Sequence, residues 1–246
     1  MGPSAALRTI SALGLREGVA AMNIAVLGTG IVGRTIAARL LELGHTVMVG
    51  TRDPQATLAR TEPDAMGNPP FSTWRNEHPG VGLASFADAA ANAELVVNAS
   101  SGDAALDVLA LAGADNLAGK VLVDVSNPLD FSEGFPPTLF VKDIDSLGEQ
   151  IQRTFPQARV VKTLNTLNAS LMVEPKSLGE GSSIFVSGND ADAKALVIGL
   201  LESFGHDDVI DLGGIETARG TEMLMPIWLR LMGSLGTTRF NFKIVR

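Results

Sequence analysis

The segment VLGTGIVGRTIA, residues 26–37, limits the possible folds of this chain more than any other stretch. It contains three glycines in G-x-G-x-x-G spacing, at Gly28, Gly30 and Gly33. A strand-like apolar run precedes the glycines, a helical pattern follows them, and a second strand-like run comes next. In that context the first glycine permits a tight turn, the second lets the backbone approach a pyrophosphate, and the third lets the helix pack closely on the strand. The segment therefore predicts a βαβ unit that binds a dinucleotide.

Short apolar runs alternate with helical patterns along the rest of the chain, which is typical of a parallel sheet built from βαβ units. Strands are expected at residues 23–28, 45–51, 82–85, 94–100, 120–126, 158–164, 182–188 and 207–213. Helices are expected at residues 31–44, 103–113, 146–155, 191–204 and 216–235, with a short helix after Pro54 and an irregular insertion from there to residue 81. The predicted fold class is α/β, with a Rossmann-type, doubly wound, mostly parallel sheet and a C-terminal helical closing segment.

Three segments are expected along the chain. Residues 1–21 are predicted to be a flexible N-terminal extension, because the first strand begins just after Met22. An upstream start codon would explain such an extension, and a weak targeting peptide is the alternative. Residues 22–213 are predicted to form the dinucleotide-binding Rossmann domain, and residues 214–246 a C-terminal helical segment and tail.

The composition argues against several classes of function. Nineteen basic and 27 acidic residues give a net charge of -8, which disfavours binding to nucleic acid or to an anionic membrane surface. The chain has no cysteine and its three histidines are scattered, so we expect no thiol catalysis and no metal site. No stretch has the roughly 18 to 20 uninterrupted apolar residues that cross a bilayer. We expect a soluble, cytoplasmic protein.

The end of the second predicted strand indicates which dinucleotide is bound. The position that reads the ribose lies roughly 20 residues beyond the glycines, and here it falls on Gly50, Thr51 and Arg52. A carboxylate there would repel a 2′-phosphate, whereas a hydroxyl and a guanidinium offer it charge-assisted hydrogen bonds. Asp53 takes the ribose role if the strand ends later, but Pro54 indicates that the chain has already turned away. The segment therefore favours NADP(H).

Three segments together resemble the coenzyme F420-dependent NADP oxidoreductases and the related cytosolic reductase domain of six-transmembrane ferric reductases. They are IAVLGTGIVGRTIAARLLELGHTVMVGTRDP, VVKTLNTLNASLMVEP and DVIDLGGIETARGTEMLMPIWLRLMG. The resemblance implies an oxidoreductase that transfers a hydride between C4 of the nicotinamide and C5 of a deazaflavin or flavin ring. Such a transfer needs no catalytic side chain and no metal, because the cofactors carry the chemistry and the protein fixes their approach.

The resemblance also implies where the cofactors bind. The expected contacts are the pyrophosphate with Gly28, Thr29, Gly30, Ile31 and Val32, the 2′-phosphate with Thr51 and Arg52, the length of the cofactor with Ser100 and Ser101, and the nicotinamide and acceptor ring with Asn127 and Asn165. The F420-dependent enzymes carry a histidine at the position of Asn165, and the ferric reductase domains carry an asparagine. The resemblance as a whole implies coenzyme F420 or a related flavin as the small-molecule redox co-substrate.

Two other functions stay open at this point. One is a flavin-linked ferric or quinone reductase, and the other is an NADPH-binding sensor without turnover, since no residue is unmistakably catalytic. Neither the acceptor nor the direction of hydride transfer follows from the residues.

Several residues in the second half of the chain have structural interpretations. Lys162, at the end of a predicted strand, is interpreted as a solvated lysine, and the alternative is that it orients an amide or a ring carbonyl. Trp228 is interpreted as a core or dimer-interface residue. The basic tail, residues 239–246, is open to two interpretations, contact with an anionic acceptor tail or an ordinary role in solubility or subunit contact. We expect a homodimer, because the apolar closing helix would leave an exposed patch on a monomer.

Overall fold

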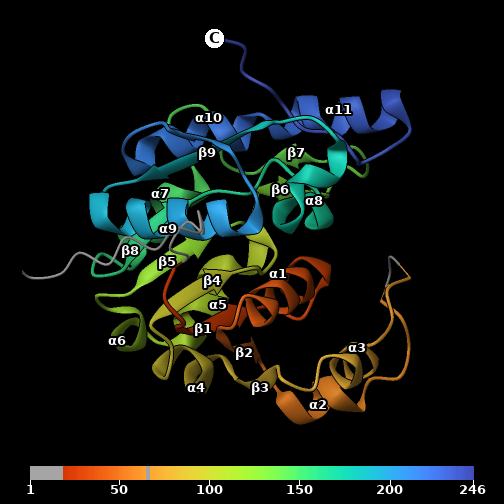
Figure 1. The fold of residues 1–246 in the computed structure, drawn as a ribbon, viewed down its shortest axis with the longest axis vertical. Helices are drawn as coiled ribbons and strands as arrows, with labels where there is room; N and C mark the ends of the chain where they lie inside the picture. The colour runs from red at the N-terminus through yellow and green to blue at the C-terminus, as the bar shows by residue number, and fades with distance from the viewer. Residues whose placement is uncertain (1–18, 65–66) are drawn as a thin grey trace, which may run out of the picture.

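The protein is built around an eight-stranded sheet that lies between two layers of helices (Figure 1). The computed structural model describes residues 19–64 and 67–246, so most of the predicted N-terminal extension lies outside the described residues. The sheet contains β1 (Asn23–Leu27), β2 (Thr46–Thr51), β3 (Gly82–Ser85), β4 (Leu95–Asn98), β5 (Val121–Asp124), β8 (Arg159–Lys162), β9 (Ser183–Gly188) and β10 (Asp208–Asp211). A separate hairpin consists of β6 (Leu129–Asp130) and β7 (Thr138–Leu139).

The helices cover both faces of the sheet. One face packs against α1 (Ile31–Glu42), α8 (Ala169–Val173) and α9 (Ala191–Phe204). The other face packs against α4 (Phe86–Ala91), α5 (Ala105–Ala112), α6 (Ala114–Leu117) and α7 (Leu147–Thr154). At opposite ends of the molecule in Figure 1 lie the pair α2 (Pro54–Ala59) and α3 (Phe71–Glu77) and the pair α10 (Ala218–Met223) and α11 (Met225–Leu235). Short 3-10 turns lie at Gly102–Ala104, Pro175–Leu178 and Ile215–Thr217.

The strand order places a ligand crevice in the middle of the sheet. The order is β10-β9-β8-β5-β4-β1-β2-β3, and β8 and β9 are the one antiparallel pair of neighbours in this sheet. The chain runs from β1 outward to β3, then returns to β4 on the other side of β1. Doubly wound sheets bind ligands beyond the carboxyl ends of the strands at such a switch point. The predicted Rossmann-type fold class is confirmed.

The strands have apolar side chains on both faces because both faces are buried. In β1, Ile24 and Val26 pack into the core beneath α1, α8 and α9, whereas Ala25 and Leu27 pack into the core beneath the opposite helices. Successive side chains of a strand point to opposite faces, so a doubly covered strand is apolar at every interior position. This explains why the strand predictions from short apolar runs succeeded, with no strand end more than two residues too long.

The single helix predicted over residues 216–235 is wrong. Two helices, α10 and α11, meet at Leu224, and Pro226 lies in the first turn of α11. Proline has no backbone N–H, and its ring clashes with the carbonyl four residues earlier, so a straight helix cannot continue through it. The closing segment therefore has two separate helical parts with different contacts.

The basic tail is held against the sheet by hydrogen bonds and an ion pair. Ser183 at the start of β9 donates its backbone N–H to the carbonyl of Phe242 at 2.9 Å, and its hydroxyl accepts from the backbone of Ile244 at 2.8 Å. Arg246 forms an ion pair with Asp208 at 2.7 Å. The charge of Arg246 is therefore paired within the chain, which favours a structural role for this residue over contact with an anionic acceptor tail.

The described part of the insertion after α2 has more regular structure than its prolines and glycines predict. It contains α3, whose first residue, Phe71, is buried in the core beneath α1. Arg34 of α1 lies over the Phe71 ring, with its guanidinium carbon 5.6 Å from the ring centroid. A long-range contact with α1 thus stabilises a helix that local composition disfavours.

Gly33 controls how closely α1 approaches the phosphate-binding turn. A Cβ at Gly33 would lie 2.2 Å from the carbonyl oxygen of Gly28, whereas a Cβ at Gly30 would meet nothing within 4 Å. The first contact involves backbone that cannot move aside without disturbing the turn. The third glycine is therefore required for packing, as its position in the motif predicts.

We expect Gly33→Ala to lower the free energy of unfolding by about 1–3 kcal/mol, the usual cost of overpacking. Chemical denaturation measures this loss. Gly30→Ala is the matched control and is expected to change stability by less than about 0.5 kcal/mol, as substitutions at open positions do. Equal stabilities of the two variants would contradict the packing role of Gly33.

Candidate functional site

A cleft of about 760 Å³ lies beyond the carboxyl ends of β4, β5 and β8. Five of the residues predicted from the sequence line it together, namely Val32, Ser100, Ser101, Asn127 and Asn165. They come from the start of α1 and from the segments that follow three different strands. The structure therefore brings Asn127 and Asn165, predicted at the nicotinamide, together with residues predicted for the pyrophosphate and the length of the cofactor. Their contacts with a cofactor stay a prediction.

A second cleft, of about 430 Å³, lies on the other side of the glycine-rich turn. Its wall includes Thr29 of the turn, Thr57 of α2 and Arg60, together with residues of the insertion. Arg34 connects the turn to the insertion, because its Nε donates to the carbonyl of Thr29 at 2.7 Å and its Nη1 to the carbonyl of Pro69. The turn thus borders both clefts, with Thr29 in one wall and Val32 in the other.

The turn itself has the geometry of an anion-binding site. Gly28 has a positive φ of 132°, and a Cβ there would lie 2.6 Å from the carbonyl oxygen of Ala99. The first turn of α1 has no acidic residue, and its N-cap, Gly30, has no side-chain cap. Unpaired N–H groups at a helix N-terminus attract a phosphate. Gly28, Gly30 and Ile31 lie around this helix end.

The predicted 2′-phosphate residues lie at the end of β2 and line neither cleft. The hydroxyl of Thr51 is buried and lies 2.8 Å from that of Thr57. Arg52 is exposed and has no hydrogen bond or ion pair with any described residue. Asp53 caps the N-terminus of α2 by accepting from the backbone of Ala56 at 2.9 Å. That contact occupies the carboxylate that the sequence left as an alternative ribose ligand.

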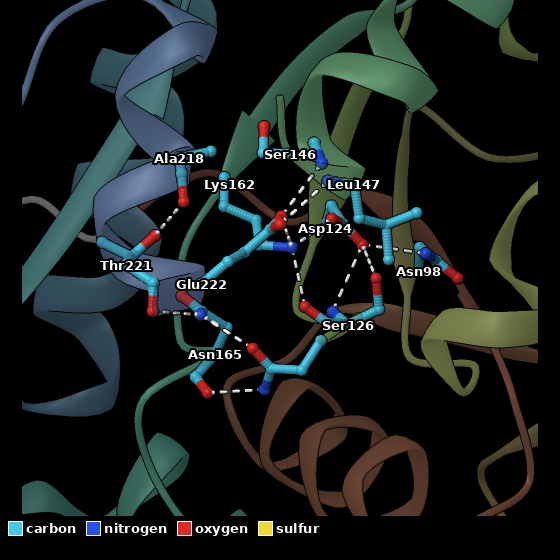
Figure 2. A network of polar contacts seen from close by, with 12 residues as sticks. Asn98, Asp124, Ser126, Ser146, Leu147, Lys162, Asn165, Ala218, Thr221 and Glu222 are labelled. Atoms are coloured by element: carbon cyan, nitrogen blue, oxygen red, sulfur yellow. Dashed lines mark hydrogen bonds and ion pairs between the residues drawn. The ribbon is translucent and has the colours of Figure 1, made fainter. Parts of the chain in front are cut away.

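A buried ionic network forms the floor behind the larger cleft, and Figure 2 shows its members converging from two strands and a helix. Lys162 of β8 forms ion pairs with Asp124 of β5 at 2.7 Å and with Glu222 of α10 at 2.8 Å. Its third contact is the backbone carbonyl of Ser126, at 2.7 Å. The side chains of Lys162 and Asp124 are inaccessible to solvent, so these contacts replace hydration entirely.

The interpretation of Lys162 as a solvated lysine is wrong. The residue is 1% exposed. Burial lowers the pKa of Lys162, but Asp124 and Glu222 outweigh burial, so the pKa lies above the ordinary lysine value. A buried ammonium is tolerated only when it is paired and fully hydrogen-bonded. The ionised lysine therefore ties α10 to the sheet.

Asn127 and Asn165 form a reciprocal pair beside this network. The amide of Asn127 donates to the backbone carbonyl of Asn165 at 2.8 Å, and the amide of Asn165 donates to the side-chain oxygen of Asn127 at 2.9 Å. Asn165 also donates to the carbonyl of Thr221 in α10 at 3.0 Å. The amide nitrogen of Asn165 is thus committed to the wall of the cleft.

Sequence reasoning missed several residues of the site. The larger cleft has an aromatic wall formed by Phe131, Phe140 and Trp228, and the hairpin next to Phe131 and Phe140 was not predicted. Trp228 also packs in a hydrophobic core cluster, as its interpretation as a core residue expects. The ion pair between Asp124 and Lys162 could have been predicted from the sequence. Asp124 and Lys162 end two apolar strands, and they are register partners in the parallel pair β5 and β8.

Two kinds of feature are missing from the described part of the chain. No group of three or more histidine, cysteine, aspartate or glutamate side chains there could hold a metal ion. Within residues 19–64 and 67–246, no helix combines the length and the apolar character needed to cross a membrane.

We expect Lys162→Met to lower the free energy of unfolding by about 3–5 kcal/mol, because it leaves two buried carboxylates without their cation. Lys194→Met is the matched control, since Lys194 also pairs with an aspartate at 2.8 Å, but that aspartate, Asp211, is 44% exposed. The control should cost no more than about 1 kcal/mol. Urea denaturation measures the free energy of unfolding of both variants. Similar losses in the two would rule out a special role for burial.

Comparison with known proteins identifies the family. Residues 23–128 match the model of the family described as NADP oxidoreductase, coenzyme F420-dependent. A crystal structure from Arthrobacter sp. FB24, provisionally assigned as an F420-dependent NADP reductase, is 66% identical, covers 92% of this chain and 100% of its own, and has a TM-score of 0.88. The F420-dependent NADP reductase of Methanothermobacter marburgensis is 28% identical over 85% of this chain and 92% of its own length.

A second group of relatives is longer. The metalloreductase STEAP3 of Rattus norvegicus is 27% identical over 85% of this chain, but the match spans only 38% of that protein. The likeness to the Arthrobacter protein extends over 92% of this chain. This chain therefore belongs to the family of F420-dependent NADP oxidoreductases and is an NADP-linked oxidoreductase.

Proposed function

We propose that this chain transfers a hydride between NADP(H) and the deazaflavin coenzyme F420. The observation that carries the proposal is the larger cleft, which lies against the anion-binding turn and has an aromatic wall. A hydride moves directly between two ring carbons, so the reaction needs two rings held in contact and shielded from water. Holding the reactants in place supplies up to roughly 7–11 kcal/mol of the barrier reduction.

The two clefts suggest how the nucleotide lies. With the pyrophosphate at the N-terminus of α1, the nicotinamide reaches the larger cleft past Val32, and the adenosine lies toward the smaller cleft past Thr29. Arg52, at the end of β2, is then on the adenosine side, where the 2′-phosphate is attached. This orientation agrees with the binding of dinucleotides across the switch point of doubly wound sheets.

The acceptor ring is proposed to occupy the outer part of the larger cleft. Phe131, Phe140 and Trp228 provide apolar faces for an aromatic ring there, and Met225 of α11 adds a flexible contact. Asn165 lies in the same wall, within reach of both rings in this arrangement.

A flavin is the second candidate acceptor. The chain resembles the part of a metalloreductase that makes up 38% of that protein's length, and it has an asparagine at position 165, as the resembling ferric reductase domains do. In this alternative the hydride passes to FMN or FAD, and a further electron carrier reduces the metal ion. The two candidates share the NADP(H) site and differ in the ring that stacks on the aromatic wall.

Steady-state turnover distinguishes the candidates. Purified protein is mixed with NADPH and with F420, FMN or FAD, and oxidation of NADPH is followed by absorbance. Faster turnover with F420 than with either flavin is expected. Preference for a flavin would favour the second candidate, and stoichiometric binding of NADPH without reduction of any acceptor would favour a sensor.

We expect Arg52→Ala to raise the KM for NADPH by about 10- to 100-fold, because a hydrogen bond to a charged group contributes roughly 1.5–3 kcal/mol. NADH lacks the 2′-phosphate and is the internal control, so its KM should stay within about two-fold, as expected where no contact is lost. Equal increases for both cofactors would show that Arg52 does not read the 2′-phosphate.

A further inference from the structure

The buried network carries an unbalanced charge. Lys162 uses all three of its N–H donors, on Asp124, Glu222 and the carbonyl of Ser126. Within the described part of the chain, each hydrogen bond and ion pair of the two carboxylates is made by an N–H or O–H donor. One ammonium and two carboxylates leave a net charge of -1 behind the larger cleft.

The two carboxylates have different surroundings. Glu222 accepts from the backbone N–H groups of Leu147 at 2.8 Å and Gly148 at 3.0 Å, the first residues of α7. The positive end of this eight-residue helix partly balances the charge of Glu222. Asp124 is buried behind the cleft instead, with Ser126 between the two, because it accepts from the hydroxyl of Ser126 at 2.7 Å and Ser126 lines the cleft.

A second chain of hydrogen bonds connects Asp124 to the cleft. The amide of Asn98 donates to Asp124 at 2.8 Å, and the hydroxyl of the cleft residue Ser100 donates to the side-chain oxygen of Asn98 at 2.6 Å. Ser100 and Ser126 therefore both direct their hydroxyl protons inward, toward the carboxylate. Their oxygen lone pairs are left for the cleft, so each serves as an acceptor toward a ligand.

We propose that this network makes the nicotinamide end of the site selective for the oxidised, cationic ring and so promotes hydride departure from NADPH. The proposal rests on the function proposed above. In the reaction the C4–H bond of the dihydronicotinamide breaks and both its electrons leave with the hydrogen. A bond forms to C5 of the oxidised deazaflavin, which then takes up a proton from solvent at a ring nitrogen. The dihydronicotinamide becomes a cation as it is oxidised.

The physical cause is the change of ring charge next to a fixed charge. NADPH has a neutral nicotinamide ring and NADP+ a cationic one, while the rest of the two molecules is the same. A buried charge is weakly screened, so it distinguishes the two rings far better than a surface carboxylate would. The outward lone pairs of Ser100 and Ser126 act in the same direction. Asp124 and Glu222 are thus positioning residues that act on the ring without touching it.

The test measures the dissociation constants of NADP+ and NADPH by isothermal titration calorimetry. In the wild-type protein NADP+ should bind at least as tightly as NADPH. Glu222→Gln and Asp124→Asn each remove one negative charge from a different element. Each should lower the ratio of the NADPH constant to the NADP+ constant by about five-fold, as expected for a charge acting over several ångströms in a protein interior.

Glu149→Gln is the matched control. Glu149 pairs with Arg219 at 2.6 Å between the same two helices, α7 and α10, but Arg219 is 36% exposed there. The same substitution at this more solvent-exposed ion pair should leave the ratio of the two dissociation constants unchanged. Circular dichroism establishes that each variant is folded, and if neither network variant folds, the wild-type ratio decides.

The outcomes separate two kinds of failure. Tighter binding of NADPH than of NADP+ by the wild type, or an unchanged ratio in a folded network variant, overturns the electrostatic role while the proposed reaction stands. A shift of the ratio in Glu149→Gln as large as in Glu222→Gln also overturns it. If the wild type binds neither nucleotide, the proposed function itself fails.

Discussion

The pairing of one buried ammonium with two buried carboxylates is the interaction on which the rest of the site depends. Lys162, Asp124 and Glu222 come from β8, β5 and α10, and each would be strongly destabilising without the others. Because the charges must meet, the strand ends and the closing segment are held in one arrangement. The wall of the larger cleft, including Asn165 and its bond to Thr221, is built on that arrangement.

The site divides its work between two kinds of group. In the proposed binding mode, Arg52 and the N-terminus of α1 lie on the adenosine side, where charged and exposed groups suit the recognition of phosphates. On the nicotinamide side no charged group of the network reaches the cleft surface, and serine hydroxyls transmit its influence. An oxidoreductase whose cofactors carry the chemistry can thus control the ring electrostatically without a catalytic side chain.

The fold was largely predictable because its signals are local. The glycine spacing and the alternation of strand-like and helical segments fixed the Rossmann-type class and all strands of the main sheet. Predictions failed where a single residue or a distant contact overrides the pattern. Pro226 divides the closing helix, and the contact of Arg34 with Phe71 stabilises a helix within a proline-rich insertion. The hairpin next to part of the aromatic wall has strands of only two residues each, too short to give a period.

The sequence by itself determined the βαβ unit with its glycine-rich turn and indicated NADP(H), because both inferences depend on residues close together in the chain. The tertiary structure alone decided which polar residues at the strand ends are buried, paired or open to the cleft. Lys162 illustrates the difference, since its partner Asp124 lies 38 residues away and its surroundings depend on α10. A charge at a strand end is solvated or buried according to what packs over it, and that covering comes from distant parts of the chain.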